Sequence, residues 1–241
     1  YYSLENKQLI FSSTQSSLIK SKLVKFIPNE KKFNDYLVFG DISGSETLHK
    51  NIFQLKPGSM IIFDGRKLIE KVYYSIENEI IIKKNNNDYN LTNEIRSTKF
   101  LRDSIKNTFL IWSDYCDDRS DILLSGGVDS SLLSLIVSKK KKYNNAFTLD
   151  FEDRKDYNEI EDAKELSKKT KSNHFTIPIN HNSIYDGIYN ISNNFDDPVP
   201  ASSGLLIYKI SEFLSTKYGT KVCLTGDGGD EIFGGYLRHQ I

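Results

Sequence analysis

A short apolar strand, a Ser-Gly-Gly turn and an apolar helix follow one another in the middle of this chain and constrain its fold more than any other feature. Residues 122–124 are typical of a buried strand, and residues 130–139 of a helix. The two glycines between them turn the chain where side chains would obstruct a ligand. Because the first N–H groups of a helix are unpaired and its dipole is positive there, the turn favours an anion, and the hydroxyls of Ser125, Ser130 and Ser131 add donors. The segment therefore predicts a binding site for a phosphate chain.

The type of phosphate loop follows from what this turn contains. It has no Gly-Lys-Ser/Thr, so it is not a Walker loop, and it lacks the three-glycine spacing of a dinucleotide fingerprint. The pattern Ser-Gly-Gly-x-Asp-Ser at residues 125–130 resembles the pyrophosphate loop of ATP pyrophosphatases, which split ATP into AMP and pyrophosphate while they adenylate a substrate. The alternative is a glycine turn that only joins a strand to a helix. A second matching motif downstream favours the phosphate role.

The second half of the chain alternates strands and helices. Such alternation predicts an α/β fold with a parallel sheet and helices on both faces, in which ligands bind at the carboxyl ends of the strands. The expected strands are residues 122–124, 146–149, 175–177 and 222–224, and the expected helices lie near residues 130–139, 158–170 and 203–217.

A glycine-rich acidic turn follows the last expected strand. Residues 224–236 read Leu-Thr-Gly-Asp-Gly-Gly-Asp-Glu-Ile-Phe-Gly-Gly-Tyr. Buried carboxylates would be costly to desolvate, while the glycines let the backbone approach a ligand closely. Asp230 and Glu231 suit the start of a helix, because negative charge is favourable there. The alternatives are a plain surface turn or a calcium loop, but the register of calcium ligands is absent.

The two loops suit one another chemically. Mg²⁺ is usually held by one or two carboxylates together with phosphate oxygens, and it neutralises the charge of a pyrophosphate leaving group. Asp129 lies on the first loop and Asp230 on the second. If both strands belong to one sheet, we expect these carboxylates to meet over one metal-phosphate cluster.

The first part of the chain carries no comparable motif. Residues 1–82 contain strand-like runs at 7–11, 59–63 and 71–74, a hairpin signal at Asp64-Gly65 and a candidate helix at 29–39. We expect residues 83–93 to form a linker, because they are polar and poor in apolar anchors, and residues 94–241 to form the second domain. Apolar residues at helical spacing follow the linker, and Trp112 at their end is expected in the core.

Composition excludes several classes of function. Thirty-two basic and thirty-two acidic residues cancel, so no excess positive field is available to hold nucleic acid. No apolar run is long enough to span a membrane, and no signal peptide opens the sequence. Two cysteines far apart in sequence, Cys116 and Cys223, fit a reducing compartment, so we expect a cytoplasmic protein in which they pack as small hydrophobes. The missing first Met and the abrupt end at Ile241 suggest an internal piece of a longer protein.

Taken together, the two loops resemble those of glutamine-hydrolysing asparagine synthetases. Further similarity lies in Phe147 to Phe151, in the acidic helix from Tyr157 to Leu166, and in Asp196-Asp197-Pro198 with Ala201-Ser202-Ser203. The first section resembles the second half of that family's class II glutamine amidotransferase domain through residues 9–13, 55–58 and 63–65. The resemblance implies a sheet of the adenine nucleotide α-hydrolase-like, PP-loop type. It implies that part of a mostly β N-terminal-nucleophile domain precedes this sheet.

The resemblance also implies a reaction and a set of site residues. ATP would adenylate the side-chain carboxylate of aspartate, and glutamine-derived ammonia would displace AMP. The residues implied for pyrophosphate are Ser125, Gly126, Gly127, Asp129 and Ser130; those for adenosine are Leu123, Leu149, Thr225 and Gly226; those for Mg²⁺ are Asp129 and Asp230. Asp227 stands where related synthetases often carry Glu, and there it would orient or deprotonate the amine. Asp196 and its neighbours are candidates for lining the substrate carboxylate pocket.

Some features of the family lie outside this sequence, and other functions stay open. The catalytic cysteine would precede Tyr1 and a transition-state lysine would follow Ile241, so the resemblance implies a piece that is incomplete for catalysis. The family's common Phe-Ala-Ser-Glu is replaced by Phe-Ser-Ser-Thr at residues 11–14. The alternatives are a relative that adenylates another carboxylate, as β-lactam and lasso-peptide cyclases do, and a nucleotide-binding scaffold without catalysis. The partners implied are small molecules, and a homodimer is among the assemblies that this interpretation allows.

Overall fold

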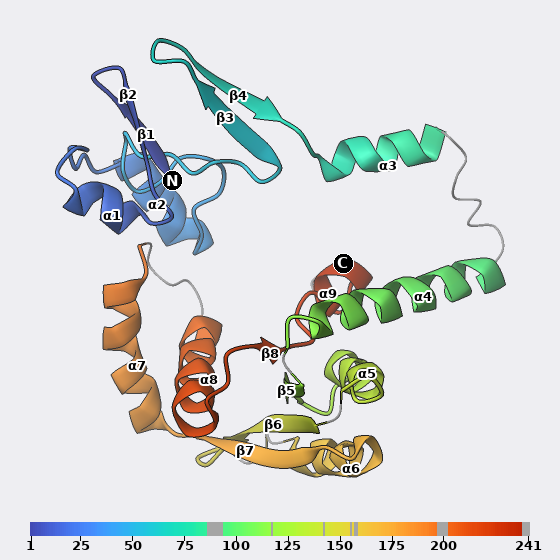
Figure 1. Ribbon diagram of the computed structural model, residues 1–241. Coiled ribbons are helices and arrows are strands. Elements are labelled where there is room, and N and C mark those ends of the chain that lie inside the picture. Colours follow the sequence, from blue (N-terminus) through green and yellow to red (C-terminus); the bar gives the residue numbers. More distant parts are fainter. Residues whose placement is uncertain are drawn as a thin grey trace. The chain divides into compact units, whose positions relative to one another are not determined.

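The computed structural model describes residues 1–85, 94–116, 118–141, 143–154, 156, 159–196 and 202–237 (Figure 1). The chain divides into two compact units. Unit 1 comprises Tyr1–Asn90 with Tyr189–Gly204, and unit 2 comprises Leu91–Ile188 with Leu205–Ile241. The expected division at residues 83–93 stays a prediction. Most of that segment lies outside the described residues, and its first three residues end a helix, α3 (Ile76–Asn85).

Unit 2 is built on a four-stranded parallel sheet in the order β7-β6-β5-β8. The strands are β5 (Arg119–Leu123), β6 (Tyr143–Phe151), β7 (Asn173–Ile179) and β8 (Cys223–Leu224). In the register, Ile122 of β5 pairs with Ala146 of β6 on one side and with Leu224 of β8 on the other. The parallel sheet expected from the alternation is confirmed, and its strand order brings the first and last strands of the sequence side by side.

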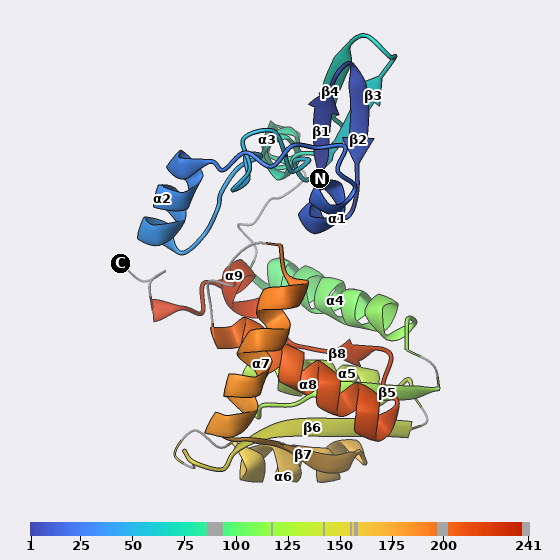
Figure 2. The same cartoon turned by 90° about the vertical axis from the view of Figure 1, so that its left-hand side faces the viewer.

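Helices cover both faces of this sheet (Figures 1 and 2). On one face, Ile122 of β5 packs against Leu133 and Val137 of α5 (Val128–Val137). Leu124, directly after β5, packs against Ala163 of α6 (Ile160–Thr170). On the other, Phe147, Ile177 and Ile179 pack against Ile210 and Leu214 of α8 (Ser202–Tyr218). Alternate residues of each strand thus serve opposite faces, as the pleat of a β-strand requires. The remaining helices of this unit are α4 (Glu94–Ser113), α9 (Gly229–Phe233) and α7 (His181–Asn194), which continues into unit 1.

The strands β5 and β6 begin earlier than their apolar cores predict. The first residues of both strands include buried polar side chains, which form hydrogen bonds with one another across the sheet. The Ser120 hydroxyl lies 2.5 Å from the Asn144 side-chain oxygen, and the Asn145 amide donates to Asp121 at 2.9 Å. These pairs extend the strands through residues that a hydrophobic pattern excludes.

Unit 1 contains two antiparallel hairpins, β1 (Tyr2–Glu5) with β2 (Gln8–Phe11), and β3 (Ser59–Phe63) with β4 (Leu68–Val72). The predicted turn at Asp64-Gly65 is confirmed. The Asp64 carboxylate accepts the backbone N–H groups of Arg66 and Lys67, at 2.8 and 2.7 Å, which holds the pKa of that carboxyl below its usual range. The third strand was expected at residues 71–74, but the backbone N–H groups of Tyr73 and Tyr74 both donate to Gly58 O instead.

Three helices accompany these hairpins. The candidate helix at residues 29–39 is confirmed as α2 (Glu30–Phe39), which follows Asn29 and ends at Gly40 with φ +70°. The helices α1 (Gln15–Lys20) and α3 were not predicted, because the former is short and Ser-rich and the latter holds a run of β-branched isoleucines. The expectation for Trp112 is wrong, since its side chain is 58% exposed beside Tyr115. Among the described residues, no helix combines the length and the apolar character needed to cross a membrane.

Both cysteines pack as small hydrophobes, as expected: Cys116 beside Ile122 and Cys223 beside the cluster around Phe147. Burial, reinforced by the nearby Asp121 carboxylate, raises the pKa of the Cys223 thiol to about 12. Because only the thiolate reacts with alkylating agents, a raised pKa suppresses the reaction at pH 8. Between the ordinary pKa of 9.0 and about 12, the unfolded chain releases a proton that the folded chain retains, so this group lowers stability as pH rises through that window.

We therefore expect iodoacetamide to modify Cys223 in the folded protein at pH 8 at least about 100-fold more slowly than in 6 M guanidinium chloride, since the thiolate fractions differ by roughly 1,000-fold. Mass spectrometry of the Cys223 peptide over time measures both rates. Equal rates in the folded and unfolded protein would contradict the burial of this thiol.

Candidate nucleotide site

The Ser-Gly-Gly loop joins the carboxyl end of β5 to the start of α5. Gly126 has φ +81° and packs against Asp162 of α6, so a side chain there would be strained and crowded. The Ser125 and Ser130 hydroxyls lie 3.0 Å apart, which closes the loop on itself. Gly127 caps α5 without a side-chain hydrogen bond. Among the described residues, the backbone N–H groups of residues 128–130 have no acceptor, so the loop offers them to an anion.

The acidic loop follows β8 and lies directly against the first loop. A methyl group added at Gly226 would stand 2.9 Å from the backbone nitrogen of Ser130, and one added at Gly229 would stand 2.5 Å from Asp129 Cγ. Only glycine therefore lets the two loops approach this closely. Asp230 lies in the first turn of α9, as predicted, and its side chain fills the space that a Gly235 side chain would need. The Asp227 carboxylate accepts a hydrogen bond of 2.8 Å from the Thr225 hydroxyl.

The two loops and the ends of β5 and β6 enclose a cavity of about 560 Å³. It brings together the following predicted site residues: Leu123, Ser125, Gly127, Asp129, Ser130, Leu149, Thr225, Gly226, Asp227 and Asp230. Gly126 is the exception, since it faces α6 rather than the cavity. Asp129 and Asp230 thus line the same cavity, on the loops that follow β5 and β8, while a shared metal ion stays a prediction.

The cavity is acidic. Among the described residues, the side chains that line it include four carboxylates, Asp129, Glu159, Asp227 and Asp230, and no basic group. Asp129 and Asp230 have no hydrogen-bond or ion-pair partner for their carboxylates in the part of the chain that the structure describes. Those residues also contain no group of three or more metal-binding side chains. Two unpartnered carboxylates beside an anion-binding loop fit a Mg²⁺ ion whose remaining ligands are phosphate oxygens and water.

Several lining residues were not predicted, namely Glu159, Phe151 and Ile210 together with Thr148, Phe147, Val128 and Leu124. Thr148 and Phe151 carry a signal that could have found them, since they lie near the carboxyl end of β6. The Thr148 hydroxyl donates to Leu124 O at 2.7 Å and lies 2.9 Å from His174 Nε2, which ties β5, β6 and β7 together. Ile210 lies within α8, and nothing in the local sequence points to a ligand there.

Asp196 does not line this cavity. Its carboxylate accepts the backbone N–H groups of Gln15 and Ser16, at 2.5 and 2.8 Å, in the first turn of α1. The Thr14 hydroxyl accepts the next N–H, from Ser17, at 3.3 Å. The expectation that Asp196 lines the substrate carboxylate pocket stays a prediction, while the structure shows that its carboxylate binds backbone groups of a segment 180 residues away. The neighbouring residues 197–201 lie outside the described residues.

Replacing Asp196 by alanine should lower the free energy of unfolding by about 1–2 kcal/mol, because two backbone donors of α1 lose their acceptor. Urea denaturation of the full-length polypeptide measures the loss. Asp41→Ala, at an exposed position, is the matched control and should change stability by less than about 0.5 kcal/mol. An Asp196→Ala variant of unchanged stability would contradict this capping role.

Comparison with known families agrees with the geometry. A family model described as Asparagine synthase matches residues 117–241, and one described as Glutamine amidotransferase domain matches residues 1–74. The chain is 30% identical over 99% of its length to a protein of Methanocaldococcus jannaschii named "Putative asparagine synthetase 2", glutamine-hydrolyzing. It is 26% identical over 98% of its length to glutamine-hydrolyzing asparagine synthetase 1 of Bacillus subtilis.

The chain spans only 45% and 35% of the length of these two relatives. Among solved structures, NMN synthetase from Francisella tularensis matches 56% of this chain and 58% of that chain, with a TM-score of 0.38 and 21% sequence identity.

Proposed function

Because this chain belongs to the asparagine synthase family, we propose that its cavity binds ATP and adenylates a carboxylate, which ammonia then converts to an amide. Aspartate is the proposed carboxylate and glutamine the proposed source of ammonia. One observation carries the proposal: Asp129 of the Ser-Gly-Gly loop and Asp230 of the acidic loop line the same cavity at the carboxyl ends of the strands.

In the first step, a carboxylate oxygen of the substrate attacks the α-phosphorus of ATP. The bond from that phosphorus to the bridging oxygen breaks, and pyrophosphate leaves with the electron pair. The open N–H groups at the start of α5 and the hydroxyls of Ser125 and Ser130 are suited to hold this leaving group as its negative charge grows. The Leu123 and Leu149 side chains and the backbone at Gly226 are placed to frame the adenosine.

The acidity of the cavity requires a cation for this step. The four carboxylates, which no basic side chain balances in the described lining of the cavity, would repel a triphosphate. Asp129 and Asp230 would hold Mg²⁺, which neutralises phosphate charge when bound.

In the second step, ammonia attacks the acyl carbon of the adenylate, AMP leaves, and the new amide nitrogen loses a proton. Asp227 is the proposed acceptor of that proton, or the group that orients the nucleophile. It is an exposed residue in the lining of the cavity, and the hydrogen bond from the Thr225 hydroxyl orients its carboxylate. Its acidic side chain is one methylene shorter than Glu, so the amine must approach the loop closely.

The test is carboxylate-dependent exchange of labelled pyrophosphate into ATP, measured on the full-length polypeptide. Exchange with aspartate, but not with glutamate or without a carboxylate, is the expected result. A screen of carboxylic acids for AMP release identifies the substrate if aspartate is inactive, and release with an acid that carries an internal amine would point to a cyclase instead.

Absence of both exchange and AMP release, together with ATP binding by calorimetry, would refute the catalytic proposal and leave a nucleotide-binding scaffold. In the sequence, the feature that favours such a scaffold is Thr14, which stands where the family commonly carries Glu. In the structure the Thr14 side chain is the N-cap of α1, which gives this threonine a role in local folding.

A further inference from the structure

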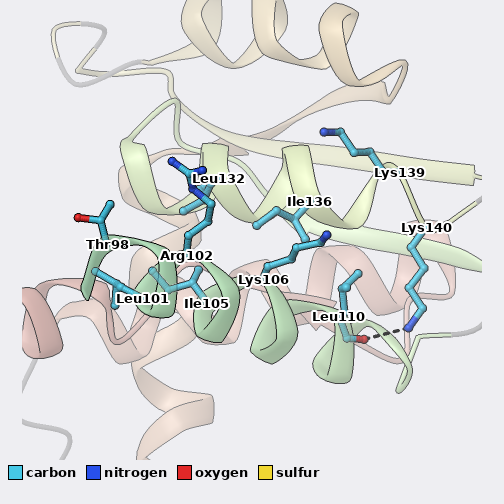
Figure 3. Close-up of a pocket in the computed structure, with 10 residues that line it drawn as sticks. All are labelled: Thr98, Leu101, Arg102, Ile105, Lys106, Leu110, Leu132, Ile136, Lys139 and Lys140. Carbon is cyan, nitrogen blue, oxygen red and sulfur yellow. Dashed lines mark hydrogen bonds between the residues drawn. The ribbon is translucent and has the colours of Figure 1, made fainter. Parts of the chain in front are cut away.

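A second cavity lies between α4 and α5, and none of the described residues lines both this cavity and the nucleotide site. Its volume is about 780 Å³. Leu101, Ile105 and Leu110 of α4 face Leu132 and Ile136 of α5 across it (Figure 3). Leu101 and Leu132 are 44% and 38% exposed, and Ile105, Leu110 and Ile136 are half-buried, so part of the apolar floor is open to solvent. We call this feature the α4/α5 groove.

Cations border this apolar floor. Arg102 and Lys106 extend from α4, and Lys139 and Lys140 follow the end of α5. Lys140 is engaged, since its ammonium donates to Leu110 O at 3.1 Å and pairs with Asp114 (Figure 3). The side chains of Arg102, Lys106 and Lys139 have no acidic partner in the part of the chain that the structure describes. The groove therefore combines a bare apolar floor with unpaired positive charge.

We propose that the α4/α5 groove binds an amphipathic α-helix of a separate protein, with an apolar stripe facing the floor and Asp or Glu side chains on its flanks. The lining residues of α4 run from Thr98 to Leu110, which spans about 18 Å, or roughly three helical turns. A trough of this length between two helices matches the way an amphipathic helix docks, by anchors at i, i+3, i+4 and i+7. Carboxylates on both flanks of that helix would complement the cations of both walls.

Two other anionic partners fit the groove less well. A fatty acid carries one carboxylate, whereas the unpaired cations are distributed between α4 and α5. An anionic membrane presents a broad surface, whereas the apolar side chains lie in a recess between two helices rather than on a convex face. An amphipathic helix of another protein matches both the elongated shape of the groove and the positions of its unpaired cations.

The test uses the full-length polypeptide and a fluorescein-labelled synthetic helix of about 14 residues, with Leu along one face and Glu on both flanks. We expect saturable binding by fluorescence anisotropy. The double variant R102E/K106E should weaken it at least about tenfold, because two attractions become repulsions. K99E changes the same charge on the same helix outside the groove and should alter affinity less than about twofold. Circular dichroism of each variant checks that α4 still folds.

Four outcomes would overturn the proposal. They are absence of binding at a peptide concentration of about 1 mM, equal binding of a peptide with Lys in place of Glu, an equal effect of K99E and R102E/K106E, and sedimentation with phosphatidylglycerol vesicles that R102E/K106E abolishes. The first includes the case in which another part of the full-length polypeptide covers the groove. None of these measurements depends on pyrophosphate exchange, so a failure of the groove proposal is distinguishable from a failure of the proposed reaction.

Discussion

Replacing Asp129 by asparagine should lower aspartate-dependent pyrophosphate exchange at least about 100-fold at saturating ATP, because one of the two carboxylates proposed to hold the cation is lost. Asp230→Asn should have an effect of the same order. Stability should not fall in either variant, since each removes one negative charge from a cavity lined by four carboxylates. Exchange kinetics and thermal unfolding of the full-length polypeptide measure the two quantities.

The matched control for these variants is Asp103→Asn, at an exposed position of α4 that lines neither cavity. It should leave exchange unchanged. Raising the Mg²⁺ concentration should partly restore Asp129→Asn or Asp230→Asn, because a weakened cation site is filled by mass action. Full exchange activity in both variants would show that these carboxylates do not serve the reaction, even though they share a cavity.

The second large effect is expected from Gly226→Ala. The added methyl group would stand 2.9 Å from the Ser130 backbone nitrogen and 3.1 Å from Asp129 Cβ. A backbone atom cannot rotate away as a side chain can, so the acidic loop must move from the start of α5. We expect exchange to fall at least about 100-fold, because a displacement of about 1 Å at the reacting groups has an effect of that order.

Gly187→Ala is the control for this substitution. Gly187 lies inside α7, where the nearest atom to an added methyl group is the end of the Lys209 side chain at 3.4 Å. Alanine in a helix is favoured over glycine, so stability should rise by about 0.5–1 kcal/mol with unchanged exchange. If Gly226→Ala keeps the exchange rate of the unmodified protein, the close approach of the two loops is unnecessary for the reaction.

Much of the nucleotide site could be predicted because its determinants are local. A Gly-Gly turn between an apolar strand and an apolar helix presents backbone N–H groups whatever the rest of the chain does. The parallel arrangement then places every loop that follows a strand at one edge of the sheet. This rule alone was enough to bring Asp129, Asp227 and Asp230 into one cavity.

Other parts could not be predicted, because they depend on contacts between residues that are distant in sequence. The starts of β5 and β6 rest on buried polar pairs such as Asp121 with Asn145. Ile210 reaches the cavity only because α8 covers the face of the sheet beside it. Trp112 occupies an apolar position of the α4 pattern and is nevertheless exposed. A period of apolar residues identifies one face of a helix, but the neighbours of that face decide which part of it is covered.

The sequence by itself determined the chemistry of the two glycine loops and the alternation of strands and helices that carries them, since both follow from backbone conformation and apolar spacing within short segments. Only the tertiary structure decided where Asp196 binds and that α4 and α5 leave an apolar groove between them. The physical reason is that a carboxylate takes whichever backbone donors the fold brings near it, and a groove exists only after two helices have packed.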